Sequence, residues 1–163
     1  LDLLSIRSAM LEEPKRWVAC IIILETVLVF TMNCVPPIWN PCEKLQNRNN
    51  LQRADIGCGA GRYDSLLLKH LPDLHLICGD VNEAMIKETT CYLEEHGQKN
   101  LSARGVDASD LQLPQGALDF VSTFNAIHHF APVRLFNHAR EALKAEGYVF
   151  VYTRLKSQNM RNI

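Results

Sequence analysis

The sequence predicts an α/β protein with an open, mostly parallel, twisted sheet that carries helices on both faces. Three observations support this class. Short apolar runs alternate with helical stretches from residue 51 onward, which is the pattern of parallel strands joined by crossover helices. A glycine-rich turn follows the first apolar run. Acidic residues follow two later runs, at strand ends, where open α/β sheets bind ligands.

Composition narrows the class of protein. A chain of 163 residues is one domain by length, and 47% hydrophobic and 21% charged residues are typical of a soluble globular protein. The formal net charge of −1 gives no global electrostatic reason to expect a nucleic-acid partner. The six cysteines form no C-x-x-C pair and have no histidine at metal spacing, so we expect no metal site. They favour a reducing compartment, and we expect a cytoplasmic protein.

The first 46 residues are predicted to be an N-terminal helix and an apolar segment of uncertain role. Residues 1–13 read as a short helix, and residues 17–32 are almost wholly apolar. The apolar run follows two basic residues, as a membrane anchor or export signal would, but it is short for a span and contains Glu25. A carboxylate at a bilayer centre costs about 2.5–3.5 kcal/mol. We therefore favour a buried helix or strand over a membrane signal or a segment foreign to the domain.

The domain proper is predicted to span residues 47–163, after three prolines and a polar linker at 43–50. Its first strand, 51–56, is short and unusually polar at Gln52 and Arg53. A helix over 63–71 is stopped by Pro72, and a second strand over 75–79 leads to Asp80.

The later elements follow the same alternation. A helix over 83–97 has an apolar inner face, and Gly97 is placed to end it. Strands are predicted over 101–106 and 117–124, a helix over 133–145, and a fifth strand over 148–152.

The turn after the first strand has glycine at alternate positions, Gly57, Gly59 and Gly61. Absent Cβ atoms let the backbone approach a ligand and adopt φ values that other residues resist. A dinucleotide fingerprint would have its third glycine at position 62, which is Arg62 here. The turn is therefore predicted to bind a ligand, but its spacing is not that of a dinucleotide site.

Two acidic residues follow strands. Asp80 lies 23 residues after Gly57, where a carboxylate can accept both hydroxyls of a ribose, or can instead cap the next helix. Asp107 can accept from an adenine amino group beside a backbone donor, or can form an Asx turn. Asp119 falls inside a strand pattern and is predicted to be structural.

The ordered series of motifs resembles the class I S-adenosylmethionine-dependent methyltransferases, in particular the type 11 family, along about 110 residues. The series runs Asp55-x-Gly57-x-Gly59-x-Gly61, Asp80, Asp107-Ala108, 118–121, 125–130 and 140–148. The resemblance implies a Rossmann-like fold that binds S-adenosylmethionine. It places Gly57, Cys58, Gly59 and Gly61 along the methionine and ribose, Asp55 toward the amino group, Asp80 and Val81 at the ribose, Asp107 and Ala108 at the adenine, and Asn125 at the methionine end.

The chain also departs from the family. The polar first strand puts its edge packing in doubt, and Ala145-Glu146-Gly147 replaces the usual Pro-Gly-Gly turn. The family's last antiparallel hairpin is not expected here, because only residues 153–163 follow the fifth strand. Either the chain is truncated at its C-terminus or the apolar N-terminal segment covers that sheet edge. An uncovered edge would invite self-association.

The resemblance implies methyl transfer to an unidentified small-molecule acceptor, with S-adenosylhomocysteine as product. His128 and His129 could supply a general base, but we favour a packing role and assign no catalytic residue. One alternative is a tRNA methyltransferase of the wobble-uridine type, suggested by residues 127–131 and a small basic tail. Another is a non-catalytic methyltransferase-like interaction module. Neither a nucleic acid nor a membrane is expected as a partner.

Overall fold

The computed structural model describes residues 17–24, 49–69, 71–107 and 111–154. The predicted helix over 1–13 lies outside these ranges, as do Ala108 and most of the polar linker. All that follows concerns the described residues.

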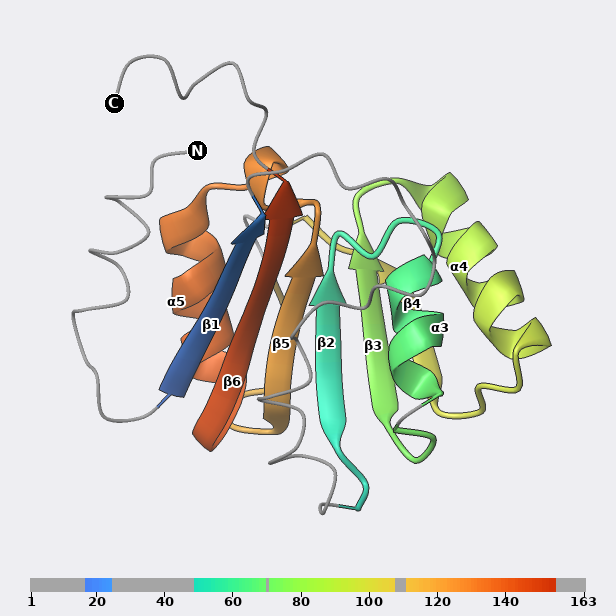
Figure 1. The fold of residues 1–163 in the computed structure, drawn as a ribbon, viewed down its shortest axis with the longest axis horizontal. Coiled ribbons are helices and arrows are strands. Elements are labelled where there is room, and N and C mark those ends of the chain that lie inside the picture. The colour runs from blue at the N-terminus through green and yellow to red at the C-terminus, as the bar shows by residue number, and fades with distance from the viewer. Residues whose placement is uncertain (1–16, 25–48, 70, 108–110, 155–163) are drawn as a thin grey trace.

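The core of the molecule is a six-stranded sheet in the order β1-β6-β5-β2-β3-β4, and every strand pair in it is parallel (Figure 1). Its strands are β1 (Trp17–Leu24), β2 (Gln52–Ile56), β3 (His75–Asp80), β4 (Leu101–Gly105), β5 (Leu118–Phe124) and β6 (Leu143–Arg154). From β2 the chain first builds outward through β3 and β4, then crosses to β5 and β6 on the other side. This reversal creates a switch point between β2 and β5, where open α/β sheets bind ligands.

Helices cover both faces of the sheet, which confirms the predicted class (Figure 1). The helices are α3 (Arg62–Leu68), α4 (Glu83–Glu95) and α5 (Pro132–Ala142), with a 3₁₀ turn η1 (Ile127–His129). Leu135 and Phe136 of α5 pack in one apolar cluster with Val121 of β5, whereas Leu67 of α3 packs in another with Phe120. Because adjacent strand residues point to opposite faces, α5 and α3 lie on opposite sides of the sheet.

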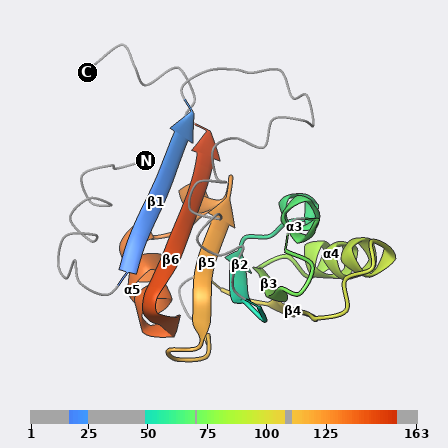
Figure 2. The ribbon, with the colours of Figure 1, turned by 60° about the horizontal axis from the view of Figure 1, so that its bottom comes forward.

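The apolar N-terminal segment supplies a strand. Over its eight residues β1 runs parallel to β6, with Trp17 opposite Gly147 and Leu24 opposite Arg154. Figure 2 shows β1 alongside β6 at one end of the sheet, with β4 and α4 at the other end. The apolar N-terminal segment therefore covers the β6 edge of the sheet, as one of the two expectations had it. Among the described residues no helix is long and apolar enough to cross a membrane.

The polar strand β2 is central in the sheet: it pairs with β3 on one side and β5 on the other, and its Arg53 is completely buried. One local prediction was wrong. The helix predicted to reach residue 145 ends at Ala142, because Leu143 is extended and pairs with Leu118 as the first residue of β6. Lys144 then forms an ion pair with Asp119 (2.7 Å), which agrees with the structural role predicted for that aspartate.

Candidate functional site

A cavity of about 500 Å³ opens at the carboxyl ends of the central strands, at the switch point. This volume lies within the range of small-molecule and cofactor sites. The turn after β2, the segment after β3 and the segment after β5 form its walls. The lining residues are Ile56, Gly57, Cys58, Gly59, Ala60, Arg62, Tyr63, Asp80, Val81, Asn82, Met85, Val106, Phe124, Asn125, Ala126, His129 and Phe130.

The glycine turn has the backbone geometry that only glycine adopts readily. Gly57 has φ +76°, and a Cβ added there would lie 2.5 Å from the Cβ of Ala126 and 2.9 Å from Cζ of Phe130. The N–H groups of Gly57 and Cys58 both donate to the carbonyl oxygen of Gly79, at 2.7 and 3.2 Å. The turn is therefore held against the end of β3, and close packing against the segment after β5 leaves no room for a side chain at position 57.

Asp80 joins two walls of the cavity. Its Oδ2 accepts a hydrogen bond from the N–H of Gly59 (2.9 Å), and its Oδ1 accepts one from the N–H of Asn82 (2.9 Å). The cap of α4 is Asn82, whose side chain accepts from the N–H of Ala84 (2.9 Å). Asp80 thus does not cap the helix. Its carboxylate is fixed at the cavity with acceptor positions remaining on each oxygen.

The wall after β5 combines aromatic rings with an amide. Asn125 has φ +53°, and its Nδ2 donates to the hydroxyl oxygen of Tyr63 (2.7 Å). The Tyr63 ring stacks on Phe124, with ring centroids 5.0 Å apart and planes 9° apart. The helix after the glycine turn and the end of β5 are therefore tied together directly beside the cavity.

The two histidines differ in position. Both belong to η1, and their rings pack against each other with centroids 4.0 Å apart. Only His129 lines the cavity. Asp107 does not line that cavity but lines an adjoining hollow of about 290 Å³ with Arg104 and Gln112, and Val106 lines both. Among the described residues, no group of His, Cys, Asp and Glu is placed to hold a metal ion.

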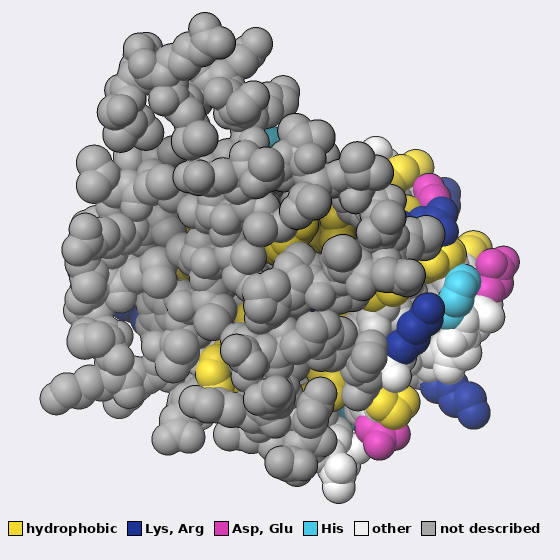
Figure 3. Space-filling view, viewed as in Figure 1, with side chains coloured by type: hydrophobic (Ala, Val, Ile, Leu, Met, Phe, Trp, Pro, Cys, Tyr) yellow, Lys and Arg dark blue, Asp and Glu magenta, His cyan; other side chains and the backbone are white. Residues whose placement is uncertain are grey.

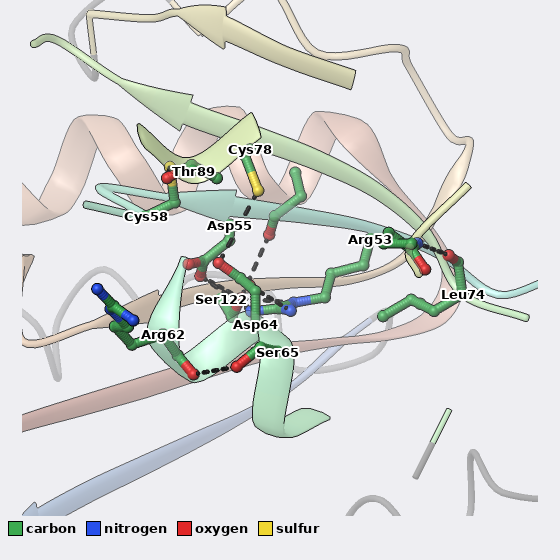
Figure 4. Close-up of polar contacts among 12 residues, drawn as sticks. Arg53, Asp55, Cys58, Arg62, Asp64, Ser65, Leu74, Cys78, Thr89 and Ser122 are labelled. Atoms are coloured by element: carbon green, nitrogen blue, oxygen red, sulfur yellow. Dashed lines mark hydrogen bonds and ion pairs between the residues drawn. The ribbon is translucent and has the colours of Figure 1, made fainter. Parts of the chain in front are cut away.

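Asp55 is not part of the cavity wall but belongs to a buried charged cluster beneath it (Figure 4). Arg53 contacts Asp55 through Nη2 (3.1 Å) and Asp64 through Nη1 (2.6 Å), and all three side chains are at most 1% exposed. Nη2 and Nε of Arg53 also donate to Oγ of Ser122, at 2.6 and 2.9 Å. Ser122 Oγ in turn donates to Oδ1 of Asp55 (2.5 Å). We call Arg53, Asp55, Asp64 and Ser122 the buried cluster.

The charges of the buried cluster do not balance, since one guanidinium faces two carboxyl groups. Burial, followed by the neighbouring Asp64, raises the pKa of Asp55 to about 7, although Arg53 and Ser122 act in the opposite direction. Burial lowers the pKa of Arg53, but Asp64 and Asp55 outweigh it, so that the pKa is raised and the guanidinium stays charged. A hydrogen bond with Cys58, together with burial, raises the pKa of the Cys78 thiol, which therefore stays neutral.

The raised pKa of Asp55 makes stability depend on pH in a defined direction. The unfolded chain loses this proton near its ordinary pKa of 3.8, whereas the folded chain keeps it until about pH 7. Between these values the folded state binds more protons, so its stability falls as pH rises and levels off above pH 7. Relative to Asp55→Asn, the native protein should lose up to about 1.4 kcal/mol per pH unit in this window. Urea denaturation of both proteins from pH 5 to 8 measures this, and parallel pH profiles would contradict it.

Sequence reasoning missed three of the four members of this cluster, Arg53, Asp64 and Ser122. Asp64 lies in the first turn of α3 and is buried against β2, whereas the sequence pattern marked only the apolar side of that helix. Arg53 was noted as polar, but its partners were not identified. The buried ion pair could have been predicted from the spacing of the arginine two residues before the aspartate in the same strand. Central strands of a parallel sheet are buried on both faces, and a buried charge needs a partner.

A family model described as a methyltransferase domain matches residues 54–147. Malonyl-[acyl-carrier protein] O-methyltransferase of Bacteroides fragilis is 28% identical over 127 residues, which cover 75% of this chain and 25% of that protein. Methyltransferase tpcH of Aspergillus fumigatus is 33% identical over 81 residues, which cover 47% of this chain and 29% of that protein. The chain thus spans about a quarter of the length of these curated relatives.

Solved structures share the fold. The YcgJ protein of Bacillus subtilis superposes with a TM-score of 0.56 and 25% identity, over 68% of this chain and 48% of that one. A SAM-dependent methyltransferase of Aquifex aeolicus superposes with a TM-score of 0.59 and 21% identity, over 69% and 61% of the two chains.

Proposed function

The chain belongs to the methyltransferase domain family, as its motifs predicted. From this premise we propose that it transfers a methyl group from S-adenosylmethionine to a small-molecule acceptor. The observation that carries the proposal is the placement of Asp80. Its carboxylate is anchored by the N–H groups of Gly59 and Asn82 at the rim of the cavity. A carboxylate held this way can accept hydrogen bonds from the two hydroxyls of a ribose.

The remaining walls fit the rest of such a ligand. Val81 is 79% exposed and lines the cavity together with Met85 and Val106, so that the three side chains offer apolar surface to a planar base. The turn at Gly57 has no side chain, so the ligand can lie against the backbone. S-adenosylmethionine supplies an electrophilic methyl group on a sulfonium, and the cavity offers carboxylate and aromatic groups suited to a positively charged ligand.

The described residues contribute mainly positioning to this reaction. Transfer of a methyl group is an in-line displacement, and holding the reactants in line supplies much of the acceleration. The Tyr63–Asn125 hydrogen bond and the stacked Phe124 ring fix one wall of the cavity. His129 lines the same cavity and is the histidine placed to take a proton from an acceptor that must lose one.

The choice of cofactor is tested by titrating S-adenosylhomocysteine, NAD and NADP against one protein sample by calorimetry. We expect measurable binding of S-adenosylhomocysteine and little or none of NAD or NADP. A pyrophosphate needs several backbone donors at the turn. The N–H groups of Gly57, Cys58 and Gly59 already donate within the protein. Tighter binding of NAD than of S-adenosylhomocysteine would overturn the proposal.

The two alternatives predict different outcomes. A tRNA methyltransferase would retain bulk tRNA on a filter with an affinity that falls steeply with salt. On the face in Figure 3, the described basic and acidic side chains are interspersed and form no basic area. A non-catalytic interaction module would show no turnover of methyl donor with any acceptor offered, while still folding.

A further inference from the structure

We propose that Arg53 is a positioning residue for the methyl-donor site, and that the buried cluster around it makes binding of the positively charged donor increase with pH. The inference rests on the proposed function. It assigns to Arg53 and Asp64 a role toward the ligand that neither residue can have by contact, because both side chains are completely buried.

The first step is mechanical. Arg53 and Asp55 come from β2, Asp64 from the first turn of α3, and Ser122 from β5, so the cluster joins the three elements that surround the glycine turn (Figure 4). The Arg53 guanidinium also lies 5.5 Å from the ring centroid of Phe124, which lines the cavity. One side chain thus holds the strand that enters the turn, the helix that leaves it and the ring on the opposite wall.

The second step is electrostatic. With one guanidinium and two carboxyl groups, the buried cluster is neutral when it holds one proton and carries a charge of −1 when that proton is lost. Burial holds the pKa of Asp55 near 7, so the change occurs around neutral pH. The thiol of Cys78 also faces the cluster, and its raised pKa keeps it neutral. Cys78 of β3 donates to Oδ2 of Asp64 (3.8 Å), and Cys58 of the turn lies beside Cys78.

The third step links the proton to the ligand. Asp55 lies two residues before Gly57, directly beneath the turn that lines the cavity. A cation in the cavity favours the deprotonated cluster in this low-dielectric surrounding. S-adenosylmethionine carries a sulfonium charge that S-adenosylhomocysteine lacks. The affinity for the donor should therefore rise with pH through neutrality, and the affinity for the product should not.

The experiment measures dissociation constants of both ligands by calorimetry at pH 6, 7 and 8. For the native protein we expect S-adenosylmethionine to bind three- to tenfold more tightly at pH 8 than at pH 6. About tenfold is the largest change in affinity over this range that the loss of one proton with a pKa near 7 can produce. S-adenosylhomocysteine should change less than twofold. In Asp64→Asn, Arg53 fully compensates the one remaining carboxylate, so the donor affinity should be flat and close to the native value at pH 6. Arg53→Met should weaken both ligands at least tenfold.

One control isolates the buried cluster. Asp119→Asn removes another buried strand carboxylate with a cationic partner, Lys144, outside the cavity, and should keep the native pH profile. An unchanged pH dependence in folded Asp64→Asn would overturn the inference and leave the proposed function standing. Absence of binding of either ligand at every pH would instead overturn the proposed function.

Discussion

Asp80→Ala is expected to weaken binding of S-adenosylhomocysteine by roughly 100-fold, or about 2.7 kcal/mol. The carboxylate has two functions that alanine cannot replace. It would accept the ribose hydroxyls, and it also accepts from the N–H of Gly59 (2.9 Å) and so holds the glycine turn in place. Hydrogen bonds to a charged group contribute about 1.5–3 kcal/mol, and the substitution removes several of them. Calorimetric titration of the variant and the native protein measures the difference.

Asp73→Ala is the matched control, because Asp73 is an exposed aspartate that precedes the same strand at its opposite end. It should bind S-adenosylhomocysteine within about twofold of the native protein, as surface substitutions away from a site are usually near neutral. Asp80→Asn separates the two functions of the carboxylate, since an amide oxygen can still accept from Gly59. A native affinity for Asp80→Ala would show that the ligand does not contact this residue.

Much of the fold could be predicted from the sequence because the relevant signals are local. Strand ends with glycine or aspartate, and Pro72 after a helix, mark the alternation of β2, α3 and β3 whatever the tertiary context. The end of α5 could not be predicted in the same way. Leu143 is a good helix former, and it becomes extended only because Leu118 offers a parallel partner from a distant part of the chain.

The site residues also differ in whether local sequence signals could predict their positions. Gly57, Gly59 and Asp80 are recognised by spacing, and the structure brings all three to one cavity. Asp55 matches the motif equally well but is buried with Arg53, and Asp107 lines an adjoining hollow that shares Val106 with the cavity. The spacing of residues along the chain predicts only at which strand end a residue lies. Whether the side chain points into a cavity or into the sheet depends on its partners, and those come from α3 and β5.

Gly57→Ala should destabilise the protein by roughly 3 kcal/mol and abolish measurable ligand binding. About 1–2 kcal/mol arises because an L-residue resists the positive φ of this position, and a further 1–3 kcal/mol from overpacking. The new Cβ would lie 2.5 Å from that of Ala126 and 2.9 Å from Cζ of Phe130, both of which line the cavity. Relief of this clash must move the segment after β5 away from the turn, which changes the shape of the site itself.

Gly97→Ala separates the backbone cost from the clash. Gly97 follows α4 with φ +81°, and a Cβ added there meets nothing within 4 Å. It should cost only about 1–2 kcal/mol and leave ligand affinity unchanged, because it lies outside the cavity. Thermal unfolding of both variants, followed by titration of S-adenosylhomocysteine below their melting temperatures, compares them. Equal destabilisation by the two substitutions would mean that the segment after β5 yields readily to a side chain at position 57, and the tight wall inferred there would be wrong.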